Sequence, residues 1–110
     1  MISEKVRKAY IPMSETAYYI LLSLSEPRHG YGIIKFVEEL TENRIILGSG
    51  TVYGTLAKMY KDKLISVYDD KDRKTIYRIT GDGCQLILLE IERIRKIYAN
   101  TLTQEGFFHE

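Results

Sequence analysis

The chain has 110 residues, of which 45% are hydrophobic and 28% charged, and its formal net charge is +1. This length allows one compact domain and excludes a large enzyme with two substrate domains. The near-neutral charge excludes a polybasic tail and an acidic disordered segment. The single cysteine excludes an intramolecular disulfide framework and a CxxC metal module. No apolar run approaches the length of about 20 residues that spans a bilayer, and the start shows no signal-peptide pattern. We therefore expect a protein of the reducing cytoplasm with no membrane partner.

Basic residues concentrate in the middle of the chain. Residues 49–80 carry seven Lys or Arg against four Asp, whereas residues 1–48 are balanced and residues 81–110 carry three basic against five acidic residues. A local cationic patch of this kind can serve a polyanionic partner without making the whole chain basic. The alternative interpretation is a solvated face with no partner.

The N-terminal half predicts two helices behind a loosely held start. Residues 1–12 are expected to form a mobile or lightly docked arm. Ser14 is a good N-cap for an amphipathic helix over 15–25, and Pro27 begins a four-residue turn. A second helix is predicted over 31–42, where apolar residues recur at helical spacing.

A third helix is predicted over 51–62, with Ser49 as its N-cap. Its inward stripe consists of Val52, Leu56 and Met59. The other face carries small or hydrogen-bonding residues first and lysines later. Gly54 within this helix costs about 1 kcal/mol relative to Ala, which a helix tolerates where its backbone must approach another molecule closely.

A hairpin follows the third helix. Residues 64–68 and 75–79 alternate with a period of two, as strands do, and the six charged residues 69–74 between them are expected to form a solvated tip. Because an isolated two-stranded hairpin is only marginally stable in water, this one must pack against the helices.

A long C-terminal helix is predicted after Thr80, its N-cap. Apolar residues recur there at alternating steps of three and four, starting with Cys84, which is the 3.5-residue period of a coiled-coil seam. The stretch from 84 to 102 would be about 27 Å long, more than this small body needs to cover its own core. We expect pairing with a second copy of the chain and a frayed tail over 103–110. The expected dimerisation residues are Ile87, Ile91, Ile94, Tyr98 and Leu102.

The order helix, helix, helix, hairpin, long helix predicts a mainly α fold with a small β-hairpin. It is typical of a winged helix-turn-helix, in which the second helix presents the third and the hairpin is the wing. Residues 1–80 would form this DNA-binding domain with its N-terminal arm, and residues 81–110 the dimerisation helix and tail.

Four short segments and one glycine carry a resemblance to a known family. They are residues 29–33 (HGYGI), 50–53 (GTVY), 63–65 (KLI) and 73–80 (RKTIYRIT), together with Gly83. In this combination the sequence resembles the PadR-like transcriptional regulators, in their short subfamily with one C-terminal helix. The resemblance implies a homodimeric repressor that places each third helix in a major groove of double-stranded DNA. The last helix lacks the tryptophan on which some multidrug-sensing relatives stack drugs, which argues against flat-drug sensing.

Binding to DNA needs cations near phosphates and short polar side chains near base edges. Thr51 and Thr55 offer hydroxyl and methyl groups to bases, and Ser49 with the free N–H groups at the helix start can hold a phosphate. The resemblance places Tyr53 at the phosphate backbone; the alternative is a core tyrosine with a local hydrogen bond. The expected cationic contacts are Lys58, Lys61, Lys71, Arg73 and Lys74.

Two further interpretations stay open. Tyr18, Tyr19 and Tyr98 either pack against apolar surface or line a cavity for a small aromatic effector at the dimer interface. The rival to direct DNA binding is a winged-helix protein–protein interaction module, a co-regulator or antirepressor, which the mixed charges of segment 69–72 favour.

Chemistry of other kinds finds no support in the sequence. Cys84, His29 and His109 match no spacing of a metal-ligand set. No nucleophile elbow, nucleotide-binding glycine loop or paired-carboxylate motif is present. We therefore expect no metal, no cofactor and no enzymatic activity.

Overall fold

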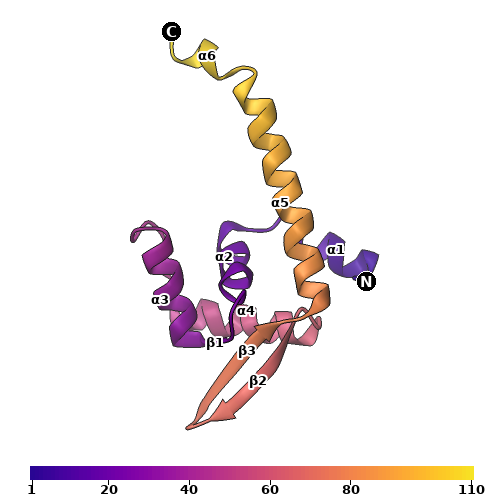
Figure 1. Ribbon diagram of the computed structural model, residues 1–110, viewed down its shortest axis with the longest axis vertical. Coiled ribbons are helices and arrows are strands. Elements are labelled where there is room, and N and C mark those ends of the chain that lie inside the picture. Colours follow the sequence, from indigo (N-terminus) through magenta and orange to yellow (C-terminus); the bar gives the residue numbers. More distant parts are fainter.

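The computed structural model describes residues 1–110 and contains six helices and three strands (Figure 1). The helices are α1 Glu4–Tyr10, α2 Glu15–Ser23, α3 Gly30–Leu40, α4 Ser49–Lys61, α5 Gly81–Leu102 and α6 Glu105–Phe108. The strands are β1 Arg28–His29, β2 Ile65–Lys71 and β3 Lys74–Ile79. The predicted mainly α fold is confirmed: α2, α3 and α4 form a body, the strands form a wing beside it, and α5 runs out from it. None of the helices combines the length and the apolar character needed to cross a membrane.

One hydrophobic core joins the three body helices to the base of the wing and of α5. The Ser14 hydroxyl accepts a hydrogen bond from the Ala17 N–H (3.1 Å), so α2 begins where its N-cap predicts. The inward stripe predicted for α4 is confirmed, and the fully buried side chains include Ile20, Leu21, Leu24, Ile33, Val37, Val52, Leu56, Met59, Leu64 and Leu86. Each large apolar side chain stabilises the fold by about 1.5–3 kcal/mol when buried, which fixes α4 with its other face toward solvent.

The arm predicted over residues 1–12 is docked on the body, which confirms one of its two expected states, and it contains a helix that the sequence did not predict. Ser3 caps α1, Tyr10 at its end is buried, and the Ile2 N–H donates to Gln85 Oε1 at 3.0 Å. The Tyr10 hydroxyl donates to Asp62 Oδ2 at 2.8 Å, at the end of α4. The sequence signal was weak because α1 has only two turns, with Val6 and Tyr10 on its packed side and Ile2 packing just before it.

The wing is a three-stranded antiparallel sheet in the order β1-β3-β2. The four-residue turn expected at Pro27 is wrong for two residues, because Arg28 and His29 pair with Tyr77 and Ile76 of β3. The tip over 69–74 is solvated as predicted, but most of it belongs to the strands. β2 and β3 stay paired as far as Lys71 and Lys74, because ladder hydrogen bonds come from the backbone whatever the side-chain charge. Only Asp72 and Arg73 turn, both with positive φ (53° and 63°), as a tight two-residue hairpin requires.

The last long helix begins as predicted and then leaves the body. Thr80 is its N-cap, with the hydroxyl accepting from the Gly83 N–H at 3.1 Å. Cys84 is exposed, so its expected place at the start of the apolar seam is wrong; Leu86 and Ile87 are buried instead, because the helix lies on the core along a face rotated from the seam. Arg93 and Ile94 still face α2 across a shallow hollow, and the C-terminal part of α5 then projects away from the body (Figure 1). The molecule is 56 Å along its longest axis. The tail expected to fray contains the short helix α6.

Candidate nucleic-acid interface

Helix α4 turns a smooth face to solvent. Gly48, not Ser49, is the N-cap, so the predicted capping role of Ser49 is wrong: Ser49 is already the first helical residue. No side chain caps this end, which leaves the first N–H groups of α4 free for an anion. Opposite the buried stripe lie four exposed residues, namely Gly50, Gly54, Ala57 and Lys61. A methyl group at Gly54 would meet no atom within 4 Å, so the helix backbone itself is accessible there.

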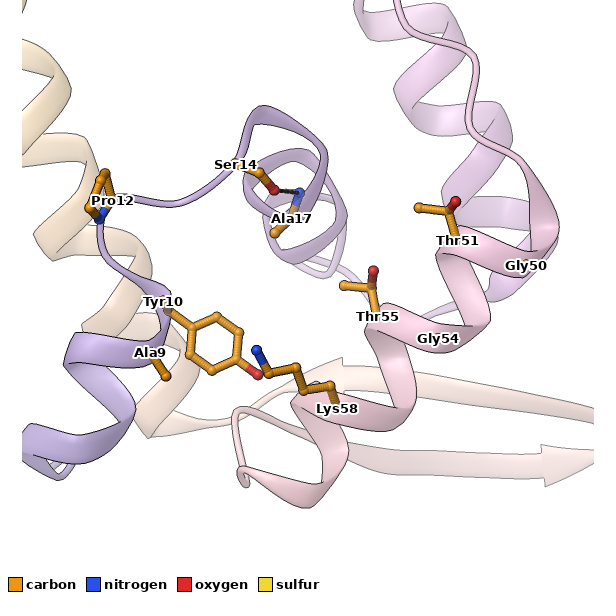
Figure 2. Close-up of a pocket in the computed structure, with 10 residues that line it drawn as sticks. All are labelled: Ala9, Tyr10, Pro12, Ser14, Ala17, Gly50, Thr51, Gly54, Thr55 and Lys58. Atoms are coloured by element: carbon orange, nitrogen blue, oxygen red, sulfur yellow. Dashed lines mark hydrogen bonds between the residues drawn. The ribbon is translucent and has the colours of Figure 1, made fainter.

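One flank of α4 faces the N-terminal segment across a hollow of about 520 Å³. Figure 2 shows Thr51, Thr55 and Lys58 of α4 on one side of it and Tyr10 with Pro12 on the other. The Lys58 ammonium lies 4.8 Å from the centre of the Tyr10 ring, a cation–π distance. The structure thus brings Thr51, Thr55 and Lys58, three residues predicted to contact DNA, together beside the N-terminal segment, which the sequence predicted only as an arm.

The other flank of α4 faces the wing, and Tyr53 lies there, half exposed, over the start of α3. A Cβ at Gly30 would lie 2.6 Å from Tyr53 Cζ, so the glycine of the HGYGI segment is required for this close approach. We call the adjoining hollow of about 260 Å³ the wing notch; its lining residues are His29, Tyr53, Arg73, Lys74, Thr75 and Tyr77.

The chemistry of the wing notch suits an anion. Helix α3 begins at Gly30 without a side-chain cap on its first N–H groups, and the positive end of its dipole points there. Two cations and three hydroxyl groups surround the same space. Burial is the main reason that the pKa of Tyr77 is raised, so its hydroxyl remains protonated and can donate.

The cations around these two flanks are mostly unneutralised. Lys58, Lys61, Arg73 and Lys74 have no carboxylate within 4.0 Å. Lys71 differs, since its ammonium lies 3.6 Å from Asp69 Oδ2. Surface ion pairs of that kind are weak, so Lys71 can exchange its partner for a phosphate at low cost.

Comparison with known proteins identifies the family. Residues 18–87 match the model of the family described as "Transcriptional regulator PadR-like family". The chain belongs to this family. The matched segment runs from within α2 to the buried part of α5 and leaves α1 outside. A PadR-like protein is a transcriptional regulator and not an enzyme, in agreement with the expected absence of catalysis.

Individual relatives of this PadR-like chain are distant. It is 28% identical over 92 residues to the transcriptional regulator YqjI of Escherichia coli, which amounts to 83% of this chain and 44% of that protein. It therefore spans less than half the length of this curated relative. A transcriptional regulator structure from Clostridium thermocellum aligns with a TM-score of 0.69 and 24% identity, covering 94% of this chain and 97% of that one. A PadR family regulator from Clostridium difficile aligns with a TM-score of 0.66 and 21% identity over 82% and 97%.

A third hollow, of about 400 Å³, lies between α2 and α5 of this PadR-like regulator. Two of the three tyrosines considered for an effector site, Tyr18 and Tyr19, line it, and their rings meet edge to face at 5.9 Å. Tyr98 does not line it within one chain. The other lining residues are Met13, Glu15, Arg44, Glu90, Arg93 and Ile94.

Glu90 is the residue of this hollow that the sequence analysis missed. Its side chain is only 1% exposed, and its carboxylate accepts hydrogen bonds from the Met13 N–H (2.6 Å) and the Arg93 guanidinium. The Arg93 contact is the main reason that the pKa of Glu90 is lowered, in opposition to burial. The available signal was a carboxylate one turn before an arginine on the packed side of the helix, which is also a common surface pattern.

The five residues expected to dimerise fall into two groups. Ile87 is buried in the chain's own core and Ile91 packs against that core. Ile94, Tyr98 and Leu102 are exposed along the projecting part of α5.

Proposed function

We propose that this PadR-like regulator is a repressor that binds specific sequences of double-stranded DNA as a homodimer. One observation carries the proposal: the outer face of α4, which includes Lys61, lies between a flank with Lys58 and a flank with Arg73 and Lys74, and none of these four cations has a carboxylate partner. A helix with its diameter of about 10–12 Å fits a major groove about 12 Å wide. The phosphates bordering that groove would then face the two flanks.

Sequence choice would come from α4 itself. Thr51 and Thr55 lie on the flank of α4 that lines the 520 Å³ hollow (Figure 2), and each carries a hydroxyl and a methyl group, which suit base edges and thymine methyl groups. Gly50 and Gly54 let the helix backbone sit deep in the groove. Tyr53, Arg73 and Lys74 would hold a phosphate in the wing notch, with help from the free N–H groups of α3.

Dimerisation would come from the projecting part of α5. Its exposed apolar residues Ile94, Tyr98 and Leu102 recur every four residues along one side of the helix, and covering them needs a second helix. A two-fold pair of chains could place two α4 helices about 34 Å apart, in successive major grooves. Repression would follow from occupancy of the operator.

The hollow between α2 and α5 supports the proposed response to an effector. It combines the Tyr18 and Tyr19 rings with two ion pairs, Arg44 with Glu15 and Arg93 with Glu90, so a small aromatic molecule with a polar substituent fits its chemistry. Because α5 forms one wall, such a ligand would alter operator affinity only if it bound one angle of α5 better than another. Quenching of tyrosine fluorescence by aromatic acids or phenols, abolished by Tyr19→Ala, is the expected sign of binding.

The direct test of DNA binding is a titration with duplexes from the region upstream of the protein's own coding sequence, at several salt concentrations. We expect tight binding at low salt, with a slope of about 0.9 per contacted phosphate. Arg73→Ala should lower this slope by about one, whereas Lys96→Ala on the projecting helix should leave it unchanged. Changes at Thr51 or Thr55 should alter the preferred sequence.

Failure to retain any duplex at low salt would contradict the proposal. Retention of a protein partner independently of salt, together with no DNA binding, would support the interaction module instead.

A further inference from the structure

Helix α1 is fixed against the flank of α4 that lies away from the wing. Its Tyr10 hydroxyl donates to Asp62 Oδ2 at 2.8 Å, and its Tyr10 ring lies under the Lys58 ammonium at 4.8 Å. The Ile2 N–H, just before α1, is bonded to Gln85 of α5. These contacts tie α1 and the residues before it to the C-terminal end of α4 and to the start of α5, although α1 lies outside the segment that matches the family.

The space between α1 and α4 is open, and its lining combines apolar surface with the hydroxyl groups of Ser14, Thr51 and Thr55. We call this hollow of about 520 Å³ the α1–α4 groove. The residues lining it are mostly small or hydroxyl-bearing, so it has room for a chain of another molecule: Ala9, Pro12, Ser14, Ala17, Gly50, Thr51, Gly54 and Thr55, with Tyr10 and Lys58 at one end (Figure 2).

The charge around the groove is positive. No carboxylate lines it, and Asp62, one helical turn after Lys58, accepts a hydrogen bond from the Tyr10 hydroxyl. Lys58 stands at its end without an ion pair, held in place by the Tyr10 ring. Lys5 lies one helical turn before Ala9, on the same side of α1, and has no carboxylate within 4.0 Å. A polyanion is the partner that this combination of space and charge fits.

We propose that the α1–α4 groove holds the second phosphate strand of the DNA major groove, opposite to the strand held at the wing notch. This inference rests on the proposed DNA binding. A helix that fills a major groove has one phosphate strand on each side. The wing notch serves one side of α4, and the α1–α4 groove, which is lined by Lys58 and by no carboxylate, lies on the other side. Lys58 and Lys5 contact the phosphates, and Tyr10 is a positioning residue for Lys58.

The test uses the full chain and two substitutions at Ala9, which is exposed on α1 and lines the groove. Ala9→Glu and Ala9→Gln have nearly the same size and good helix propensity, so they differ mainly in charge. We expect Ala9→Glu to bind the operator duplex about tenfold more weakly than Ala9→Gln at low salt, through repulsion of the phosphates. Thermal unfolding of both variants controls for stability.

Two further measurements locate the contact. Lys5→Gln should lower the salt slope by about one, whereas Lys96→Gln should not change it. Phosphate-ethylation interference should show that Lys5→Gln and Arg73→Ala lose sensitivity at phosphates on opposite strands of the same major groove.

The outcomes separate the two proposals. If the unaltered protein binds DNA and depends on Arg73, but the two Ala9 variants bind alike and Lys5→Gln keeps its slope, the α1 contact is refuted and DNA binding stands. If the unaltered protein binds no duplex, the proposed function itself fails, and this inference with it.

Discussion

The two halves of α5 differ in what covers them, although their sequences look alike. The first half buries Leu86 and Ile87 in the core of its own chain. The second half also repeats apolar residues but extends away from the body, with Ile94 and Tyr98 exposed (Figure 1). A periodic pattern of apolar residues therefore predicts which face of a helix is buried, but not whether the residues that bury it belong to the same chain. The two halves should therefore respond differently to substitution.

The largest expected effect lies in the buried half. Leu86 is 0% exposed and Leu88, on the same turn, is 62% exposed. Leu86→Ala should lower the free energy of unfolding by about 2–5 kcal/mol, because it leaves a cavity. Leu88→Ala should change it by no more than about 0.5 kcal/mol. Urea denaturation at two protein concentrations measures both; equal losses would show that the two faces are not distinct.

The next effect lies in the projecting half. Ile94→Glu should convert the proposed dimer to a monomer at micromolar concentration and weaken operator binding about 100-fold, since the linkage between two half-site contacts is lost. Lys96→Glu adds a carboxylate two residues away on the opposite face and should leave the dimer intact. Size-exclusion chromatography with light scattering distinguishes the two. An unchanged assembly for Ile94→Glu would place the interface elsewhere.

A smaller effect is expected where the buried half begins. A Cβ at Gly83 would lie 2.2 Å from the backbone oxygen of Leu64, whereas one at Gly81 would meet nothing within 4 Å. Gly83→Ala should therefore lower the free energy of unfolding by about 1–3 kcal/mol through overpacking. Gly81→Ala should be neutral or stabilise by up to about 1 kcal/mol. Thermal unfolding compares the stabilities of the two variants. A Gly81→Ala protein less stable than the Gly83→Ala protein would contradict the close packing of α5 on Leu64.

The smallest effect concerns Glu90, at the boundary between the two halves. The pKa of its carboxyl is lowered in the folded chain, so its stabilisation is present above the unfolded value of about 4.3 and is lost as the pH falls through the folded value. At pH 7 we expect Glu90→Gln to cost about 1 kcal/mol. The difference from the unaltered protein should shrink below pH 4.

A matched control is available for that substitution. Glu92→Gln removes an exposed partner of Lys96 and should cost less than about 0.5 kcal/mol at any pH. A pH-independent deficit for Glu90→Gln would contradict the role of its charge.

The sequence predicted the helices of the body and the start of α5 better than it predicted the N-terminal segment and the wing. The inward stripe of α4 and the cap at Thr80 follow from local periodicity and hydrogen bonding, and both are confirmed. Helix α1 and the pairing of Arg28 with Tyr77 depend on contacts between distant parts of the chain, which local patterns do not encode. The sequence singled out Tyr53 and Arg73 but did not predict the wing notch that they form with His29. These residues come together only because Tyr53 packs on Gly30.

The most direct test of the account is sedimentation of the protein with an operator duplex selected from random sequence. The account predicts a dimer in the absence of DNA at micromolar concentration and two chains on each duplex, with affinity that falls steeply as salt rises. A 12.8 kDa monomer that leaves the duplex unbound in dilute buffer would contradict it.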